Sequence, residues 1–327
     1  MKGRRGVGSG SIWVLCVVAG LLVGCEAKLR LAAVEEAGRE PIRRSDQYQA
    51  AVAAPDRLVV VGTHGVVLTS THGDSWTRQD LPGWPSLIDL ARCPDGTWVA
   101  LAFEREVWTA APDAARWTRV PLADGETPQA ITCDPQGRWW IAGGFSSLQW
   151  TADGGRNWHT HTLDEDLFLT SVQFVDAMTA YATGEFGTVI RSRDGGATWE
   201  RLESLPDEFY PQDAWFADAQ RGWIVGLRGG ILATEDGGDS WSRQASPTLA
   251  PLYGLGIVDG IPQAVGGEGV VLRLQDGHWQ RIDYADPVHG FLRAIAPAPG
   301  GRVLVAGGGG ALRLIPAGAT RALASAP

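Results

Sequence analysis

The sequence predicts an all-β protein, a seven-bladed β-propeller built from four-stranded antiparallel blades. Three observations predict this fold: a tryptophan that returns about every 41 residues, a glycine in the same register, and a recurring Asp-Gly-Gly turn. The tryptophans are Trp76, Trp117, Trp158, Trp199, Trp241 and Trp279, and the glycines are Gly62, Gly143, Gly184, Gly226, Gly266 and Gly307. Repeats of this length, made of short strands and turns, are typical of propeller blades. Seven such units fit between Tyr48 and the C-terminus.

Each repeat contains the strands of one blade, and the fourth repeat shows them most clearly. A strand over Leu169–Phe174 is followed by a turn and a second strand over Ala180–Thr183. Gly184–Gly187 turns into a third strand, Thr188–Ser192, and an Asp-Gly-Gly turn leads to a fourth strand around Trp199. These runs are short and rich in β-branched and aromatic residues, and no amphipathic helix separates them. The pattern therefore favours antiparallel strands throughout.

The two ends of the repeat region predict how the ring closes. The last repeat lacks a boxed tryptophan after its third strand, so its fourth strand has to come from elsewhere. Pro41–Asp46 resembles the segment that follows Trp76, and we expect it to pair into the last blade and cover that sheet edge. The expected domains are 1–24 as a leader, 25–40 as a tether and 41–327 as the propeller, with Ala322–Pro327 frayed.

The leader has a basic start followed by an apolar run, Ile12–Val23, which is shorter than the roughly 20 residues of a membrane-spanning helix. The run ends in Leu-Val-Gly-Cys25, which resembles the lipobox of bacterial lipoproteins. That resemblance implies a signal peptide cut before Cys25, lipidation of Cys25, and a bilayer anchor through the attached acyl chains. Glu26 resembles outer-membrane sorting signals. We expect an exported, membrane-anchored lipoprotein that faces the periplasm; the alternative is an ordinary secretory signal.

The charge of the chain argues against nucleic acid as a partner. The chain carries 28 Lys and Arg against 37 Asp and Glu, a net charge of −9. Removing Lys2, Arg4 and Arg5 with the leader takes away three positive charges and brings the net charge to −12. Nucleic-acid binding depends on basic side chains that neutralise phosphates. The same acidity opposes attraction to anionic lipid, so we expect the anchor to be covalent.

The Asp-Gly-Gly turns admit two interpretations, a catalytic or metal-binding carboxylate and a structural turn. Their repeated residues are Asp153, Trp158, Asp194, Trp199, Asp236 and Trp241. An Asp before two glycines accepts hydrogen bonds from nearby backbone N–H groups, the glycines permit positive φ, and the tryptophan buries a ring between strands. Because these tasks recur in several blades whereas catalysis needs one place, we predict a structural role.

The repeat also carries a family resemblance. Ser/Thr-x-Asp-Gly-Gly-x-Thr/Ser-Trp is the Asp box of bacterial neuraminidase (BNR) repeats. The longer pattern, clearest in YATGEFGTVIRSRDGGATW and WIVGLRGGILATEDGGDSW, resembles the photosystem II stability and assembly factor family over about Tyr48–Leu314. This resemblance implies a non-enzymatic propeller on the trans side of a membrane that assists assembly of a membrane-protein complex, in photosynthesis for some members. Those photosynthetic members are associated with an arginine-rich patch, from which this acidic chain departs.

Two rival functions remain: an accessory lipoprotein of an envelope transporter, and a sialidase-like or other glycoside hydrolase. Acidic loops such as Asp164–Asp166 would supply the two carboxylates that glycosidases need, but no Arg-Ile-Pro motif typical of sialidases lies early in the chain. His159 and His161 lie on one face of a strand, yet a zinc site needs at least a third ligand. We therefore predict no catalytic residue, no metal and no cofactor.

Cys93 and Cys133 are the two cysteines that follow Cys25, and each ends the first strand of its repeat. First strands of neighbouring blades converge on the propeller axis, where Cα atoms can approach the roughly 4.4–6.8 Å of a disulfide. Disulfides persist in exported proteins. The sequence leaves two alternatives for this pair, a disulfide and two buried free thiols.

The partner is expected on one face of the propeller. The loops that join blades and the turns between second and third strands share a face, and the Asp boxes lie on the other. The first face is rich in aromatic residues, which are enriched at interface cores. We predict that it binds a membrane protein or membrane complex, with the propeller itself monomeric; the alternative is that half of these rings fill joints between blades. The candidates are Trp84, Phe145, Phe168, Phe186, Phe209, Tyr210, Arg228, Tyr253, His289 and Phe291.

Overall fold

The structure, a computed structural model, describes residues 3, 36–122 and 125–316. The chain separates into two compact units, Met1–Glu40 and Pro41–Pro327. In the first unit only Gly3 and 36–40 belong to the described residues, so the predicted lipidation site Cys25 lies outside them. Within the described residues, we find no helix with the length and apolar character needed to span a bilayer.

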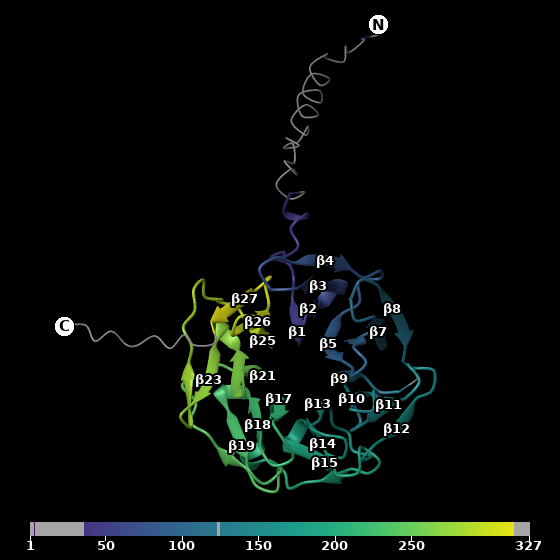
Figure 1. Ribbon diagram of the computed structural model, residues 1–327, viewed down its shortest axis with the longest axis vertical. Coiled ribbons are helices and arrows are strands. Elements are labelled where there is room, and N and C mark those ends of the chain that lie inside the picture. The colour runs from purple at the N-terminus through teal and green to yellow at the C-terminus, as the bar shows by residue number, and fades with distance from the viewer. Residues whose placement is uncertain (1–2, 4–35, 123–124, 317–327) are drawn as a thin grey trace, which may run out of the picture. The chain divides into compact units, whose positions relative to one another are not determined.

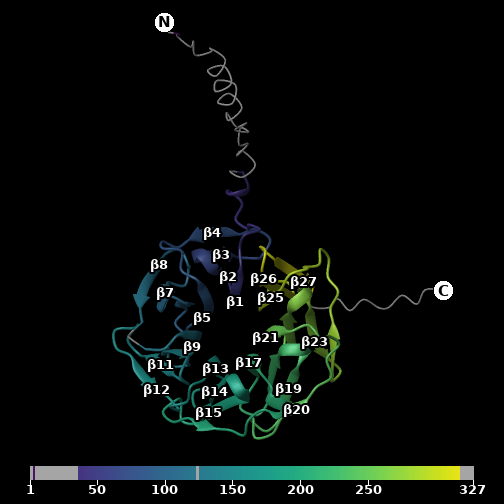
Figure 2. The ribbon, with the colours of Figure 1, turned by 180° about the vertical axis from the view of Figure 1, so that it is seen from behind.

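The second unit is a seven-bladed β-propeller, as predicted (Figures 1 and 2). Blades one to four comprise β1 (Tyr48–Ala54), β2 (Arg57–Gly62), β3 (Val66–Ser70), β4 (Thr77–Asp80), β5 (Leu87–Arg92), β6 (Trp98–Ala102), β7 (Glu106–Ala110), β8 (Trp117–Pro121), β9 (Pro128–Cys133), β10 (Trp139–Gly143), β11 (Leu148–Thr151), β12 (His159–His161), β13 (Leu169–Phe174), β14 (Ala180–Gly184), β15 (Thr188–Ser192) and β16 (Glu200–Arg201). Blades five to seven comprise β17 (Pro211–Phe216), β18 (Gly222–Gly226), β19 (Ile231–Thr234), β20 (Ser242–Arg243), β21 (Leu252–Val258), β22 (Ile261–Gly266), β23 (Val271–Gln275), β24 (His278–Arg281), β25 (Leu292–Ala298), β26 (Arg302–Gly307) and β27 (Leu312–Pro316).

Every blade is an antiparallel sheet whose strands follow chain order from the axis outward. Six blades have four strands, and the last has three among the described residues. Short 3-10 turns interrupt the chain at η1 (Thr63–Gly65), η2 (Glu185–Gly187), η3 (Pro206–Glu208), η4 (Leu227–Gly229) and η5 (Gly267–Gly269). The inner strands β1, β5, β9, β13, β17, β21 and β25 therefore surround a central channel.

The hydrophobic core lies between neighbouring blades. Between blades three and four, the buried ring of Trp140 lies 5.2 Å from Phe174 and 6.0 Å from the boxed Trp199, measured between ring centroids. Between blades four and five, Tyr181 stacks on Phe216 with centroids 3.7 Å apart. Each blade thus buries its apolar surface against the next one, as is typical of stacked repeats.

The segment Pro41–Asp46, predicted as a fourth strand of the last blade, forms turns instead. The Asp46 carboxylate accepts the backbone N–H of Arg43 at 2.8 Å and the hydroxyl of Tyr48 at 2.9 Å. The Asp46 N–H in turn donates to the Arg43 carbonyl at 3.0 Å. The prediction of a strand is wrong here because an Asp side chain that bonds the local backbone competes with extended structure.

Closure of the ring depends on contacts between blades seven and one. The Gly310 N–H donates to the Asp46 carbonyl at 2.8 Å, and Gln47 forms an isolated bridge with Gly308. On the opposite side of the propeller, Arg302 of β26 donates to the Asp74 carboxylate at 2.7 Å, in the turn after β3. The first and last blades are therefore joined at both faces.

Candidate functional site

The alternating strand direction gives the propeller two different faces. The turns between second and third strands and the segments between blades lie on one face, which we call the connecting face. The turns between first and second strands and the Asp-Gly-Gly turns lie on the other, which we call the box face. Each sequence-predicted residue can therefore be assigned to a face from its place in its blade.

On the box face, the aspartates of the Asp-Gly-Gly turns are fully engaged inside their own turns. Asp194 accepts hydrogen bonds from the Ser192 hydroxyl at 2.9 Å, the Thr198 N–H at 2.9 Å and the Thr198 hydroxyl at 2.6 Å. Asp153 and Asp236 accept the equivalent bonds. The side-chain bonds, followed by the backbone bonds, lower the pKa of all three carboxyls to about 2.

The second glycine of each turn lets it lie against the preceding blade. A Cβ at Gly196 would lie 2.5 Å from the Trp140 ring, and the residue has φ of 86°. The corresponding Gly155 and Gly238 approach Val120 and Leu202 of their preceding blades. The boxed rings lie beside these glycines: Trp158 next to Gly155, and Trp241 next to Gly238. In this arrangement the turns join neighbouring blades, and the oxygens of their carboxylates already accept hydrogen bonds within the turn.

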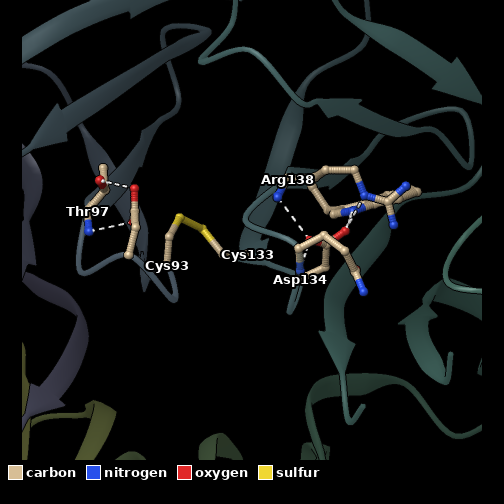
Figure 3. The surroundings of a disulfide bond; sticks show 8 residues. Cys93, Thr97, Cys133, Asp134 and Arg138 are labelled. Atoms are coloured by element: carbon tan, nitrogen blue, oxygen red, sulfur yellow. Dashed lines mark hydrogen bonds and ion pairs between the residues drawn. A yellow bond between two sulfur atoms is a disulfide. The ribbon is translucent and has the colours of Figure 1, made fainter. Parts of the chain in front are cut away.

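A disulfide joins blades two and three (Figure 3). Cys93 follows β5 and Cys133 ends β9, with their Cα atoms 5.0 Å apart. Beside it, the fully buried Asp134 carboxylate pairs with Arg138 and accepts the indole N–H of Trp140 at 2.9 Å. The covalent link joins the box-face ends of two neighbouring inner strands, and the polar cluster holds the turn between β9 and β10.

The central channel, about 410 Å³ in volume, contains two carboxylates that the sequence interpretation missed. Asp89 of β5 accepts the N–H of Ile131 in the next blade at 2.7 Å, and Asp213 of β17 accepts the N–H of Leu255 at 2.8 Å. Desolvation raises the pKa of Asp89 to about 6 and that of Asp213 to about 7. Their signal in the sequence is an Asp as the third residue of the inner strand in repeats two and five.

The connecting face holds most of the exposed apolar surface. Ten large apolar or aromatic side chains are exposed among the described residues, and eight of them belong to turns or segments of this face. The eight are Trp84, Phe103, Phe145, Phe168, Phe186, Tyr210, Leu227 and Leu249; the other two are Met178 and Trp215. Contiguous exposed apolar surface marks interaction sites in soluble proteins, whereas scattered single residues do not.

Five of these side chains, which we call the aromatic arc, lie in consecutive turns of blades three to five: Phe145, Phe168, Phe186, Tyr210 and Leu227. Glu185 organises its centre, because its carboxylate accepts the N–H of Phe168 at 3.0 Å and the hydroxyl of Tyr210 at 3.0 Å. Phe186, the next residue, is 70% exposed. One turn thus fixes the segments on both sides of the most exposed ring of the arc.

The turn between second and third strands holds a non-glycine residue in the left-handed region in six blades. In blade two this residue is Arg105, with φ of 64°; at the turn apex of the other five it is His64, Phe145, Phe186, Arg228 or Glu268, with φ between 51° and 60°. The equivalent residue of the last blade is Gly309. A bulky residue at positive φ is strained, and such strain gathers at functional sites. The chain therefore keeps side chains at these apices at a conformational cost.

A family profile described as photosynthesis system II assembly factor YCF48 matches residues 109–208. Photosystem II assembly protein Ycf48 of Synechococcus sp. (strain JA-3-3Ab) is 24% identical over 160 residues, or 46% of this chain and 48% of the relative. Over this part of its sequence the chain is therefore similar to photosystem II assembly factors. Photosystem II assembly lipoprotein Ycf48 of Synechococcus sp. (strain CC9902) is 28% identical over 101 residues, 29% of this chain and 30% of that relative. The matches thus span about half the length of the first relative and under a third of the second.

Solved structures resemble the propeller over most of its length. YCF48 bound to a D1 peptide superposes with a TM-score of 0.70 at 15% identity, covering 84% of this chain and 93% of that one. Inactive virginiamycin B lyase from Staphylococcus aureus with quinupristin gives a TM-score of 0.71 at 12% identity, covering 82% and 94%. At such identities these likenesses establish the fold alone.

The structure separates the predicted partner-binding residues into three groups. Trp84, Phe145, Phe168, Phe186, Tyr210, Arg228 and His289 are exposed on the connecting face. Phe209 is buried, with 6% of its surface exposed, because Gly226 and Gly230 leave room for its ring; its assignment to a free surface is wrong. Tyr253 and Phe291 are partly buried and form an edge-to-face pair, with Tyr253 in the channel wall.

The sequence interpretation also missed three exposed residues of this face, Phe103, Leu227 and Leu249. Phe103 and Leu227 follow the last residue of a second strand, so the repeat register alone would have placed them there. Within the described residues, no group of three His, Cys, Asp or Glu side chains is arranged to hold a metal ion.

Proposed function

We propose that the chain is a lipid-anchored, non-enzymatic scaffold that binds a segment of a membrane protein on its connecting face. In this role it assists assembly of the complex to which that membrane protein belongs. The observation that carries the proposal is that, in the part of the chain that the structure describes, eight of the ten exposed large apolar side chains lie on one face. Aromatic rings presented on rigid turns bury large areas at little loss of side-chain entropy, as interface cores require.

The relatives support the same role. Two curated relatives are named as photosystem II assembly proteins, and one of them is named a lipoprotein, in keeping with the lipobox at Cys25. A solved structure of similar fold is named as YCF48 bound to a D1 peptide. A D1 peptide is therefore the first partner to test, with segments of other exported membrane proteins beside it.

The geometry of the Asp-Gly-Gly turns argues against their carboxylates as the catalytic pair of a glycoside hydrolase. A hydrolase needs one carboxyl to hold a proton near neutral pH and a second that is free to act. The hydrogen bonds within the turns lower the pKa of Asp153, Asp194 and Asp236 to about 2 and occupy both oxygens of each carboxylate. These residues are suited to holding turns together.

Binding of a D1 peptide to the purified propeller tests the proposal. Phe145→Ala and Phe186→Ala should each weaken binding about tenfold or more, because each removes a ring from the arc. Met178→Ala is the matched control, since Met178 is also exposed but lies in the β13–β14 turn on the box face. Unchanged binding in both phenylalanine variants, or an equal loss in the Met178 variant, would contradict the proposal.

The anchor and the absence of catalysis have their own readouts. Growth in labelled fatty acid should label the wild-type chain but not Cys25→Ser, and the variant should leave the membrane fraction. A chain that stays membrane-bound without label contradicts the covalent anchor. Turnover of a fluorogenic sialoside or of quinupristin by the purified propeller would contradict the non-enzymatic role.

A further inference from the structure

We infer that the connecting face selects a linear polypeptide segment in which apolar side chains stand next to a lysine or arginine. The inference rests on the proposed function and specifies the chemistry of the segment. The apolar side chains would contact the aromatic arc. The cationic residue would lie at the end of the arc formed by blades three and four.

The carboxylates around the arc divide into engaged and free groups. Glu165 pairs with Arg201, Asp207 pairs with Arg243 at 3.0 Å, and Glu185 holds its two hydrogen bonds. Glu126, Asp164 and Asp166 are exposed, and their carboxylates have no ion-pair or hydrogen-bond partner among the described residues. Glu203, in the segment between β16 and β17, is also exposed, and its carboxylate has no such partner among the described residues. Three of these four free carboxylates therefore lie in two segments, the one before β9 and the one between β12 and β13.

These free carboxylates lie beside the rings of the arc. The space above Gly144 is bounded by the Phe168 ring, 3.1 Å from an ideal Cβ position, and by the Glu126 side chain at 3.6 Å. Asp164 and Asp166 precede Phe168 in the same segment. An apolar residue seated on Phe168 would therefore place a neighbouring cation within reach of these carboxylates.

The opposite end of the arc carries the opposite charge. Arg228, at the apex of η4, is exposed and has no ion-pair partner among the residues that the structure describes. Three free carboxylates thus lie at one end of the arc and one free guanidinium at the other, with Glu203 in the segment between them. Complementary charges of this kind fix the direction in which a segment binds and suppress wrong partners.

A bilayer surface is the other occupant to consider for exposed aromatic rings, and the charges oppose it. Membrane surfaces that attract proteins electrostatically carry anionic headgroups, which pair with lysine and arginine. The free groups at the Phe145 and Phe168 end of the arc are carboxylates. A cationic polypeptide segment therefore fits this surface better than lipid does.

The strained apices supply the matched variants for a test. Phe186 and His64 occupy the same turn position in blades four and one, with φ of 55° and 60°. Glycine adopts this conformation freely, as Gly309 does in the last blade. Phe186→Gly and His64→Gly should therefore both keep or raise the melting temperature, while only the first removes a ring of the arc.

The experiment measures binding of three short synthetic peptides to the whole mature protein. The peptides share an apolar core and differ in one flanking residue: lysine, glutamine or glutamate. The lysine peptide should bind about tenfold more tightly than the glutamate peptide, and the preference should weaken with salt. The triple variant Glu126→Gln, Asp164→Asn, Asp166→Asn should lose the preference while keeping affinity for the glutamine peptide.

The outcomes distinguish failure of the charge inference from failure of the proposed function. Equal binding of all three peptides, abolished by Phe186→Gly but not by His64→Gly, would overturn the charge inference and leave the proposed function standing. No effect of Phe186→Gly on any peptide would overturn both. Tight binding to vesicles of phosphatidylcholine and phosphatidylglycerol without peptide binding would identify lipid as the occupant and also overturn the inference.

Discussion

The disulfide between Cys93 and Cys133 makes a quantitative prediction about stability. The cysteines are separated by 40 residues along the chain, and a crosslink of that span lowers the entropy of the unfolded state by an amount worth about 4 kcal/mol at 25 °C. Replacing both by serine should therefore reduce the free energy of unfolding by about 2–4 kcal/mol. The lower end of that range applies if the unfolded chain retains residual structure.

The folded blades should tolerate this loss, because other contacts hold the same interface. The N–H of Ile131 remains bonded to Asp89, and Val99, Leu101 and Trp139 remain in the apolar cluster of blades two and three. The double variant should therefore keep the partner affinity of the wild type. Its change should appear mainly as a more expanded unfolded state and a steeper dependence of unfolding free energy on denaturant.

Urea unfolding followed by tryptophan fluorescence measures the effect, using a form that begins at Glu26 so that Cys93 and Cys133 are its two cysteines. Reduced wild type should match the double serine variant, and oxidised wild type should be more stable than both. Two free thiols in denatured, unreduced protein would refute the bond itself. Equal unfolding free energies for oxidised and reduced wild type would refute the entropic reasoning.

Three further predictions concern the channel, the blade contacts and the arc. Burial raises the pKa of Asp213 in the folded state from 3.8 to about 7, so the protonated carboxyl stabilises the fold fully below pH 3.8 and this stabilisation is lost as pH rises through 7. In Asp213→Asn the melting temperature should therefore fall less over this pH range than in the wild type. Gly196→Ala should lower the free energy of unfolding by about 2 kcal/mol or more, because the new Cβ would meet the Trp140 ring. Gly137 has a similar φ but open space around it, so Gly137→Ala should lower the free energy of unfolding by only about 1 kcal/mol in urea titrations. Equal losses in the two variants would contradict the steric argument. Glu185→Ala should weaken partner binding with little change in melting temperature, since it removes the acceptors of both hydrogen bonds that hold the neighbouring segments; a large fall in melting temperature would instead assign Glu185 to folding.

Much of the propeller could be predicted from the sequence because its information is local and repeated. The spacing from Trp158 to Trp199 and on to Trp241 sets the blade length, and the strand and turn residues between them set four strands per blade. These features depend on neighbours within about ten residues along the chain, so each repeat reports the same structure independently. The number of blades and the chain order of their strands followed from this pattern alone.

Contacts between distant segments decided what the repeat pattern left open. Phe186 and Phe209 are both aromatic residues in turns of the connecting face, yet one is exposed and the other is buried against Gly226 and Gly230 of the next blade. Asp46 is one of many acidic residues in the sequence, but its carboxylate also accepts a hydrogen bond from Arg78 of β4 at 2.8 Å, and its contacts hold Pro41–Asp46 away from extended structure. Burial and carboxylate partners are properties of the folded chain, because each depends on groups that other segments bring into contact. For that reason the sequence by itself determined the architecture, and the tertiary structure decided which residues are available to a partner.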